Sequence, residues 1–191
     1  MIAKIKPVLV LSVICTLVCA LLIVTYNLTY VDTSGVITDD LRAACVAVDG
    51  ECEFALVTDR AAAGLDGEEF DSVLKIVKNK DKGTFLFEVV TDGYSADGID
   101  VVIGMTDDGK VSGIAVVALG ETPGLGTKIN DTAFFDKFKG ASDTITISKN
   151  PPKADNEIQA VTGATYSSKG LASAVNTAIS AYGRLNKEVQ A

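Results

Sequence analysis

The sequence predicts an α+β protein in which one N-terminal transmembrane helix precedes a single, mostly antiparallel α/β domain. Three observations lead to this prediction. An uncharged apolar run fills residues 7–31, β-rich segments separated by turn signals fill residues 72–119, and apolar residues recur at helical spacing over residues 171–185. With 191 residues, the chain is long enough for one globular domain with a core of ordinary size.

The apolar run PVLVLSVICTLVCALLIVTYNLTYV is long enough to cross a bilayer, because about 20 residues at a helical rise of about 1.5 Å span the hydrocarbon core. Lys4 and Lys6 precede it, so the positive-inside tendency predicts a cytoplasmic N-terminus. Tyr26 and Tyr30 fall where an outer aromatic belt is expected. We therefore expect residues 1–31 to be a single-pass anchor in the inner or plasma membrane, with the domain on the periplasmic or extracellular side.

Two alternatives to a retained anchor remain open. A cleaved signal peptide usually has a shorter apolar region followed by a small-x-small cleavage site, and nothing between Leu21 and Tyr30 has that pattern. A lipid-modified cysteine at Cys15 or Cys19 would follow a bulky residue in each case. The length of the run favours the anchor.

The composition excludes several classes of function. A formal net charge of -8 argues against nucleic acid as a partner, because such binding needs clustered Lys and Arg side chains. The chain has no His, which removes His-based general bases, His-activated nucleophiles and His-ligated metals. Cys45 and Cys52 are too few for an iron–sulfur cluster or a four-cysteine zinc site, so we assign no metal ligand. A disulfide between them stays open, because the turn at Asp49-Gly50 would allow closure.

The region between the anchor and the predicted sheet is polar and punctuated by Gly and Asp. We expect residues 32–70 to connect the membrane to the domain, with a helix possible in DDLRAACVAV, and residues 71–191 to form the domain. Strands are predicted in SVLKIVKN, TFLFEVVT, IDVVIGM and KVSGIAVVAL, with turns at NKDKG and at Asp107-Asp108-Gly109. Their hairpin spacing predicts a mostly antiparallel sheet.

Several elements follow the predicted sheet. GETPGLGTKI, residues 120–129, is expected to be a loop with special backbone geometry, because it contains Pro and three Gly. TAFFDKF is predicted to be a short helix that buries its Phe side chains, and DTITIS alternates as a strand. The apolar residues from Leu171 to Leu185 share one face of a final helix, which we expect to pack on the sheet.

The stretch VTGATYSS leads into this final helix and places small residues beside hydroxyl groups. Gly163 and Ala164 remove side-chain bulk, so another molecule can approach Thr165 closely. The helix presents unpaired amides and a partial positive charge, which favour a phosphate group, and Ser167 or Ser168 can cap it. The same residues are ordinary capping material, so a purely structural role stays open on physical grounds.

Two motifs in this chain resemble those of a known family. VTGATYSS resembles the S/T-G-A-T attachment motif of the membrane-anchored FMN-binding domain family, and ETPGLGTKI resembles that family's second signature. The family includes the G subunit of the Rnf complex and the C subunit of the sodium-translocating NADH:quinone reductase. The similarity runs from GYSADGIDVVIGMTDDGKVSGI through the last helix, and the single N-terminal anchor also fits. The length of the chain favours the Rnf member, because the quinone reductase member is typically longer.

The resemblance implies that the hydroxyl of Thr165 carries FMN through a phosphoester, installed by a separate flavin transferase that acts on FAD. The flavin is then a redox relay for which the protein supplies position and electrostatics, and Thr165 is a tether rather than a catalytic residue. The other residues carried over to the flavin site are Thr162, Gly163, Ala164 and Ser167 around the attachment turn, and Glu121, Thr122, Gly124, Leu125, Gly126 and Lys128 in the second signature.

The resemblance also implies a role and partners. The chain is expected to be an electron-carrying subunit of an ion-translocating ferredoxin:NAD oxidoreductase, with other membrane subunits of an Rnf-type complex as partners. The alternatives are the C subunit of a quinone reductase, a free-standing membrane-anchored flavin module, and a structural anchor with an unmodified threonine. The chain departs from the family pattern at Gln159, where Asp is usual, at Leu119-Gly120, where His is common, and at Tyr166, where a smaller residue is frequent.

Overall fold

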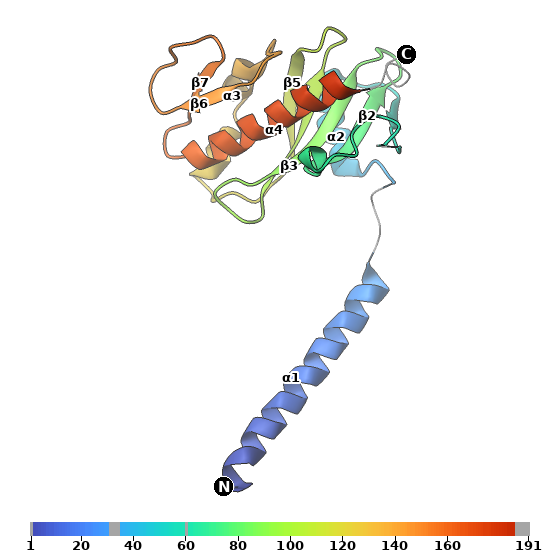
Figure 1. Ribbon diagram of the computed structural model, residues 1–191, viewed down its shortest axis with the longest axis vertical. Helices are drawn as coiled ribbons and strands as arrows, with labels where there is room; N and C mark the ends of the chain where they lie inside the picture. Colours follow the sequence, from blue (N-terminus) through green and yellow to red (C-terminus); the bar gives the residue numbers. More distant parts are fainter. Residues whose placement is uncertain (1, 31–34, 60, 186–191) are drawn as a thin grey trace. The chain divides into compact units, whose positions relative to one another are not determined.

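The computed structural model describes residues 2–30, 35–59 and 61–185, and the chain divides into two units, Met1–Thr33 and Ser34–Ala191 (Figure 1). The first unit contains α1 (Ile2–Thr29). Its span Pro7–Thr29 has a mean hydropathy of 3.0 in its most apolar window, and its side chains are not buried against protein. At about 1.5 Å per residue this span reaches about 35 Å, enough to cross the hydrocarbon core. The predicted long apolar helix is therefore present.

Polar side chains within α1 bond to the helix itself. The side chains of Thr16, Thr25 and Asn27 each donate a hydrogen bond to the carbonyl oxygen four residues earlier. A polar group placed in lipid is costly unless it finds a partner within the protein. These bonds make the three polar side chains compatible with a membrane span.

A five-stranded antiparallel sheet forms the centre of the domain, and each strand pairs with the next strand in the chain (Figure 1). The predicted mostly antiparallel sheet is confirmed, and so are the four strands expected within residues 72–119. The strands are β1 (Phe54–Leu56), β2 (Val73–Asn79), β3 (Phe85–Thr91), β4 (Ile99–Met105) and β5 (Val111–Leu119). The predicted turn before β5 is also confirmed, with Gly109 at a φ of 76°.

Two helices cover opposite faces of this sheet (Figure 1). The long helix α4 (Thr165–Arg184) packs on the face that carries Phe85 and Phe87, as the spacing of its apolar residues predicts. The shorter helix α2 (Asp39–Asp49) packs on the face that carries Leu86. Successive residues of a strand point to opposite faces, so the central strand β3 is apolar almost throughout and buried on both sides.

Within the segment expected to connect the membrane to the domain, α2 packs on the sheet and β1 pairs with β2. Helix α2 starts after Thr38, whose side chain accepts a hydrogen bond from the Leu41 N–H at 3.3 Å. Leu41 and Cys45 are fully buried against the sheet, and β1 extends the sheet beside β2. The sequence pattern hid this packing because α2 buries only a narrow stripe of mostly small side chains, and β1 has only three residues.

The remaining elements lie between β5 and α4, apart from the short helix η1 (Glu68–Phe70). As predicted, TAFFDKF is helical and buries its phenylalanines, and DTITIS contributes a strand. The elements are η2 (Gly126–Ile129), α3 (Thr132–Phe135), η3 (Asp136–Phe138), and the parallel pair β6 (Thr146–Ser148) and β7 (Glu157–Gln159). This region brings the segment that follows β6 close to the start of α4.

The two cysteines of the domain are free thiols in the structure. Cys45 belongs to α2 and is fully buried against the sheet, and Cys52 donates a hydrogen bond to the Gly50 carbonyl at 3.2 Å. Burial, helped by the nearby Glu88 carboxylate, raises the pKa of Cys45 to about 12. Because the thiolate is the reactive form, this thiol is chemically inert and acts as a small apolar group in the core.

A cluster of ionisable groups lies on the α2 face of the sheet. Lys75 and Glu88 are direct partners across β2 and β3, and their side chains form a buried ion pair at 3.4 Å. Asp100 of β4 lies diagonally across from Glu88, and its Oδ1 is buried without a hydrogen-bond partner in the described part of the chain. Burial and the Glu88 carboxylate raise the pKa of Asp100 to about 6, although Lys75 lowers it.

This raised pKa predicts how the stability of the domain depends on pH. Asp100 favours folding when protonated, so its contribution is complete below the unfolded-state pKa of about 4 and is lost as the pH rises through about 6. We expect Asp100→Asn, which stays neutral, to stabilise the domain by about 1–3 kcal/mol at pH 8 and to have little effect at pH 4.

Thermal unfolding of the full chain in detergent, followed by circular dichroism at both pH values, measures this difference. Asp155→Asn is the matched control, because Asp155 is exposed. An equal gain in stability for Asp100→Asn at pH 4 and pH 8 would contradict the raised pKa of Asp100.

Candidate functional site

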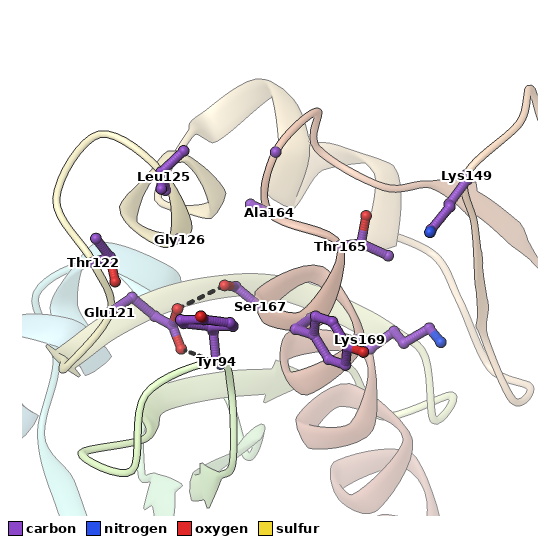
Figure 2. A pocket seen from close by; sticks show the side chains of 12 residues that line it. Tyr94, Glu121, Thr122, Leu125, Gly126, Lys149, Ala164, Thr165, Ser167 and Lys169 are labelled. Carbon is purple, nitrogen blue, oxygen red and sulfur yellow. Dashed lines mark hydrogen bonds between the residues drawn. The ribbon is translucent and has the colours of Figure 1, made fainter.

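A pocket of about 310 Å³ lies where three segments of the chain meet (Figure 2). These segments are the connection between β3 and β4, the loop that follows β5, and the turn into α4 with the first turns of that helix, and they supply all the lining residues except Lys149, which follows β6. The two sequence signatures lie in the second and third segments, about forty residues apart, and the fold places them on opposite sides of one cavity.

Most of the residues expected at the flavin site line this pocket. They are Glu121, Thr122, Leu125, Gly126, Gly163, Ala164, Thr165 and Ser167. Thr162, Gly124 and Lys128 are exposed and do not line it. Gly124 shapes the loop instead, since it has a φ of 74° and donates its N–H to the Thr127 hydroxyl at 2.9 Å. Lys128, which the resemblance carries over to the flavin site, is exposed to solvent at the end of the same loop.

The structure adds lining residues that sequence reasoning did not assign to the site. Tyr94 comes from the connection between β3 and β4, and Lys149 comes from the segment after β6. Only the fold brings these two residues to Thr165, so no local pattern predicts them. Lys169 lies four residues after Thr165 and therefore on the same helical face, a relation that the sequence alone could have shown.

The stretch VTGAT forms a tight turn that leads directly into α4. Gly163 has a φ of 81°, which favours glycine, and the Ala164 N–H donates to the Val161 carbonyl at 2.9 Å. Helix α4 begins at Thr165, and its first backbone bond runs from the Ser168 N–H to the Ala164 carbonyl. Thr165 is half-buried and lines the pocket, and Figure 2 shows the Lys149 side chain directed toward it.

The expectation that Ser167 or Ser168 caps this helix is wrong, because the helix begins before either residue. Ser168 is fully buried, and its hydroxyl donates to the Ala164 carbonyl at 2.8 Å and accepts from the Val161 N–H at 3.0 Å. It therefore holds the attachment turn from inside. The N-cap residue Ala164 makes no side-chain capping bond, so the first amides of α4 remain available as donors toward the pocket.

The carboxylate of Glu121 joins all three segments of the pocket (Figure 2). Its Oε2 accepts from the Ser167 hydroxyl at 2.7 Å. Its Oε1 accepts from the backbone N–H groups of Tyr94 at 2.7 Å and Ser95 at 3.3 Å. Glu121 is only 4% exposed, and both of its oxygens are engaged by the protein itself. Glu121 thus positions the pocket and is not free to bind a ligand.

Two glycines make room for this carboxylate. A Cβ atom on Gly126 would lie 2.1 Å from Glu121 Oε2, and a Cβ atom on Gly93 would lie 1.9 Å from Glu121 Oε1. Any side chain at either position would displace the buried carboxylate. The last Gly of ETPGLG is therefore required on steric grounds by the Glu that begins the signature. Gly93 lies outside the signature but is required for the same reason.

Comparison with known proteins places the chain in a family. Residues 93–180 match the family model described as FMN-binding domain, and this stretch contains all the pocket residues. Over 148 residues the chain is 32% identical to the G subunit of the Na(+)-translocating ferredoxin:NAD(+) oxidoreductase complex of Acetobacterium woodii, covering 74% of this chain and 70% of that protein. The chain belongs to this family of oxidoreductase G subunits. The resemblance predicted from the two signatures is thereby confirmed.

Other relatives carry related names. The chain is 38% identical over 88 residues to the G subunit of the proton-translocating ferredoxin:NAD(+) oxidoreductase complex of Clostridium ljungdahlii, which covers 46% of each protein. It is 29% identical over 156 residues to the G subunit of the ion-translocating oxidoreductase complex of Aliivibrio fischeri, covering 80% of this chain and 69% of that protein. Among solved structures, the C subunit of the Na(+)-translocating NADH-quinone reductase of Parabacteroides distasonis matches with a TM-score of 0.47 and 20% identity over 58% of this chain and 60% of that chain.

Substitutions of Glu121 test its positioning role. Glu121→Ala leaves one buried and two partly buried donors without their acceptor, so we expect it to reduce the free energy of unfolding by about 1–3 kcal/mol. Glu121→Gln keeps one oxygen acceptor and should cost less, because its amide can donate to the Ser167 hydroxyl. Urea unfolding of the full chain measures both changes, with the exposed Glu51→Ala as control. Equal stabilities for Glu121→Ala and Glu51→Ala would refute this role.

Proposed function

We propose that this chain carries FMN covalently on Thr165 and serves as an electron-transfer subunit of a membrane-bound, ion-translocating ferredoxin:NAD oxidoreductase. The observation that supports this most strongly is the setting of the Thr165 hydroxyl. It lines a pocket at the first turn of α4, beside uncapped helix amides and opposite a lysine. The names of the related G subunits support the assignment to such a complex over the quinone reductase alternative.

The residues around Thr165 fit the phosphate end of FMN. Lys149 and Lys169 line the same pocket and supply positive charge from two different elements. The uncapped N-terminus of α4 adds hydrogen-bond donors and the positive end of the helix dipole. Gly163, two residues before Thr165, offers no side chain that would block a group attached to Thr165. A negatively charged phosphoester is therefore favoured at this position on electrostatic and steric grounds.

The protein's contribution to function is positional. An ester at Thr165 would keep the flavin at a fixed place on the domain through repeated electron exchanges. The flavin itself, when bound, supplies reversible electron-accepting chemistry. Glu121 holds the pocket walls together, and Lys149 offsets the charge of the phosphate. No residue of the chain needs to act as an acid, base or nucleophile during turnover.

Attachment requires a separate enzyme in this proposal. A flavin transferase that acts on FAD installs the FMN, and it must reach the threonine. The motif is accessible to such an enzyme, because Thr162 and Gly163 are exposed and Thr165 is half-buried at the mouth of the pocket. Gln159 is also exposed, at the end of β7, so it is available to the transferase as a recognition position.

The membrane arrangement is likewise a proposal. Helix α1 anchors the chain, with its N-terminus in the cytoplasm and the flavin domain on the periplasmic or extracellular side of the membrane. This orientation rests on Lys4 and Lys6, which precede the apolar span. Other membrane subunits of an Rnf-type complex would exchange electrons with the flavin and could pack against α1 within the bilayer.

Replacing the hydroxyl of Thr165 tests the attachment site. Thr165→Val keeps the shape of the side chain and removes only the oxygen, so the domain should still fold while covalent flavin is lost. The measurement is yellow-green fluorescence of the band on a denaturing gel after co-expression with a flavin transferase. Thr162→Val is the control and should still become labelled, because Thr162 does not line the pocket. A fluorescent band from the Thr165→Val protein would show that the attachment site is wrong.

A further inference from the structure

Exposed apolar side chains of the domain gather at the mouth of the pocket. Within the described part of the domain, the large hydrophobic side chains that are strongly exposed are Val36, Leu74, Tyr94, Leu125 and Tyr166. The last three all line the pocket, although they come from the β3–β4 connection, the loop after β5 and helix α4. Exposed apolar groups gathered from separate segments are typical of a binding surface.

The two tyrosines of this group lie close together without being packed away. Tyr94 is 73% exposed and Tyr166 is 68% exposed. Their ring centroids are 6.3 Å apart, and the ring planes are inclined by 56°. The pair is thus an open wedge, not a parallel stack, and most of each ring surface is free to contact another aromatic group at van der Waals distance.

The backbone beneath both rings is held in place. The N–H of Tyr94 is bound by Glu121 Oε1 at 2.7 Å, and Ser167, the neighbour of Tyr166, is bound by Glu121 Oε2 at 2.7 Å. One buried carboxylate therefore fixes the separation of the two residues that carry the rings. A flat ligand would find this surface already formed, which reduces the entropy lost on binding.

We propose that Tyr94, Leu125 and Tyr166 form the binding surface for the isoalloxazine ring of the flavin. This inference rests on the proposed attachment of FMN at Thr165. Tyr166 directly follows Thr165, so FMN attached to Thr165 would hold its isoalloxazine ring near the two tyrosine rings. Lys149 and Lys169 supply the positive charge that suits the phosphate, and the three apolar side chains suit the uncharged, planar part of the ligand.

Spectroscopy of the labelled full chain in detergent tests this surface. Contact with a phenol ring quenches flavin fluorescence, and a ring held in one orientation shows visible circular dichroism. We expect the native fluorescence to rise at least about twofold in Tyr94→Leu and Tyr166→Leu, and the visible dichroism to weaken, because the stacking contacts are lost. Tyr94→Phe and Tyr166→Phe should raise the fluorescence but keep the dichroism, since the flat ring remains.

The control is Leu74→Ala, which removes an exposed apolar side chain that does not line the pocket and should change neither signal. A denaturing gel of the same samples measures covalent flavin separately. If the unaltered chain carried no covalent flavin, both the proposed function and this inference would be wrong. Normal labelling with unchanged fluorescence and dichroism in the double variant Tyr94→Leu/Tyr166→Leu would overturn the ring-binding surface alone. If that variant instead failed only to assemble with other subunits, the tyrosines would be a protein-docking surface, and the inference would be equally wrong.

Discussion

The buried carboxylate of Glu121 is the interaction on which the rest of the site depends. It is the point where the loop after β5, the β3–β4 connection and the start of α4 are joined by hydrogen bonds. Two of these bonds are short, at 2.7 Å, and the burial of the carboxylate makes any alternative arrangement costly. The glycines at positions 93 and 126 follow from it, because only a residue without Cβ leaves room for the two carboxylate oxygens.

The surrounding fold brings α4 close enough for this contact. The Thr91 hydroxyl donates to the Gly170 carbonyl at 3.0 Å, which ties the end of β3 to the second turn of α4. A Cβ atom on Gly170 would lie 2.4 Å from the Asp92 carbonyl oxygen, so this close approach also requires glycine. The sheet and α4 together therefore set the position of Thr165 relative to the second signature. The same contact explains why a motif at the start of a helix and a loop about forty residues away act as one site.

The sequence predicts the regular parts of this structure well because their patterns are local. The alternating and apolar segments of residues 72–119 become four strands, and the apolar face of residues 171–185 becomes the buried side of α4. Prediction from the sequence fails where a pattern is weak or where an element depends on contacts between distant residues. Helix α2 buries a stripe too narrow to mark it as part of the core, and β1 is too short to be recognised.

In the candidate site too, the sequence predicts the residues that belong to local motifs and misses those that depend on distant contacts. The two signatures identify both walls of the pocket, but Tyr94 and Lys149 reach it only through the fold. The capping role expected for Ser167 is wrong because its hydroxyl is used by Glu121, 46 residues earlier in the chain.

Intact-mass spectrometry of the natively isolated chain tests most directly our proposal that Thr165 carries FMN through a phosphoester. We expect a polypeptide heavier by one FMN less one water molecule, with fragmentation placing the added mass on Thr165. A bare polypeptide, or the same added mass on another residue, would contradict it.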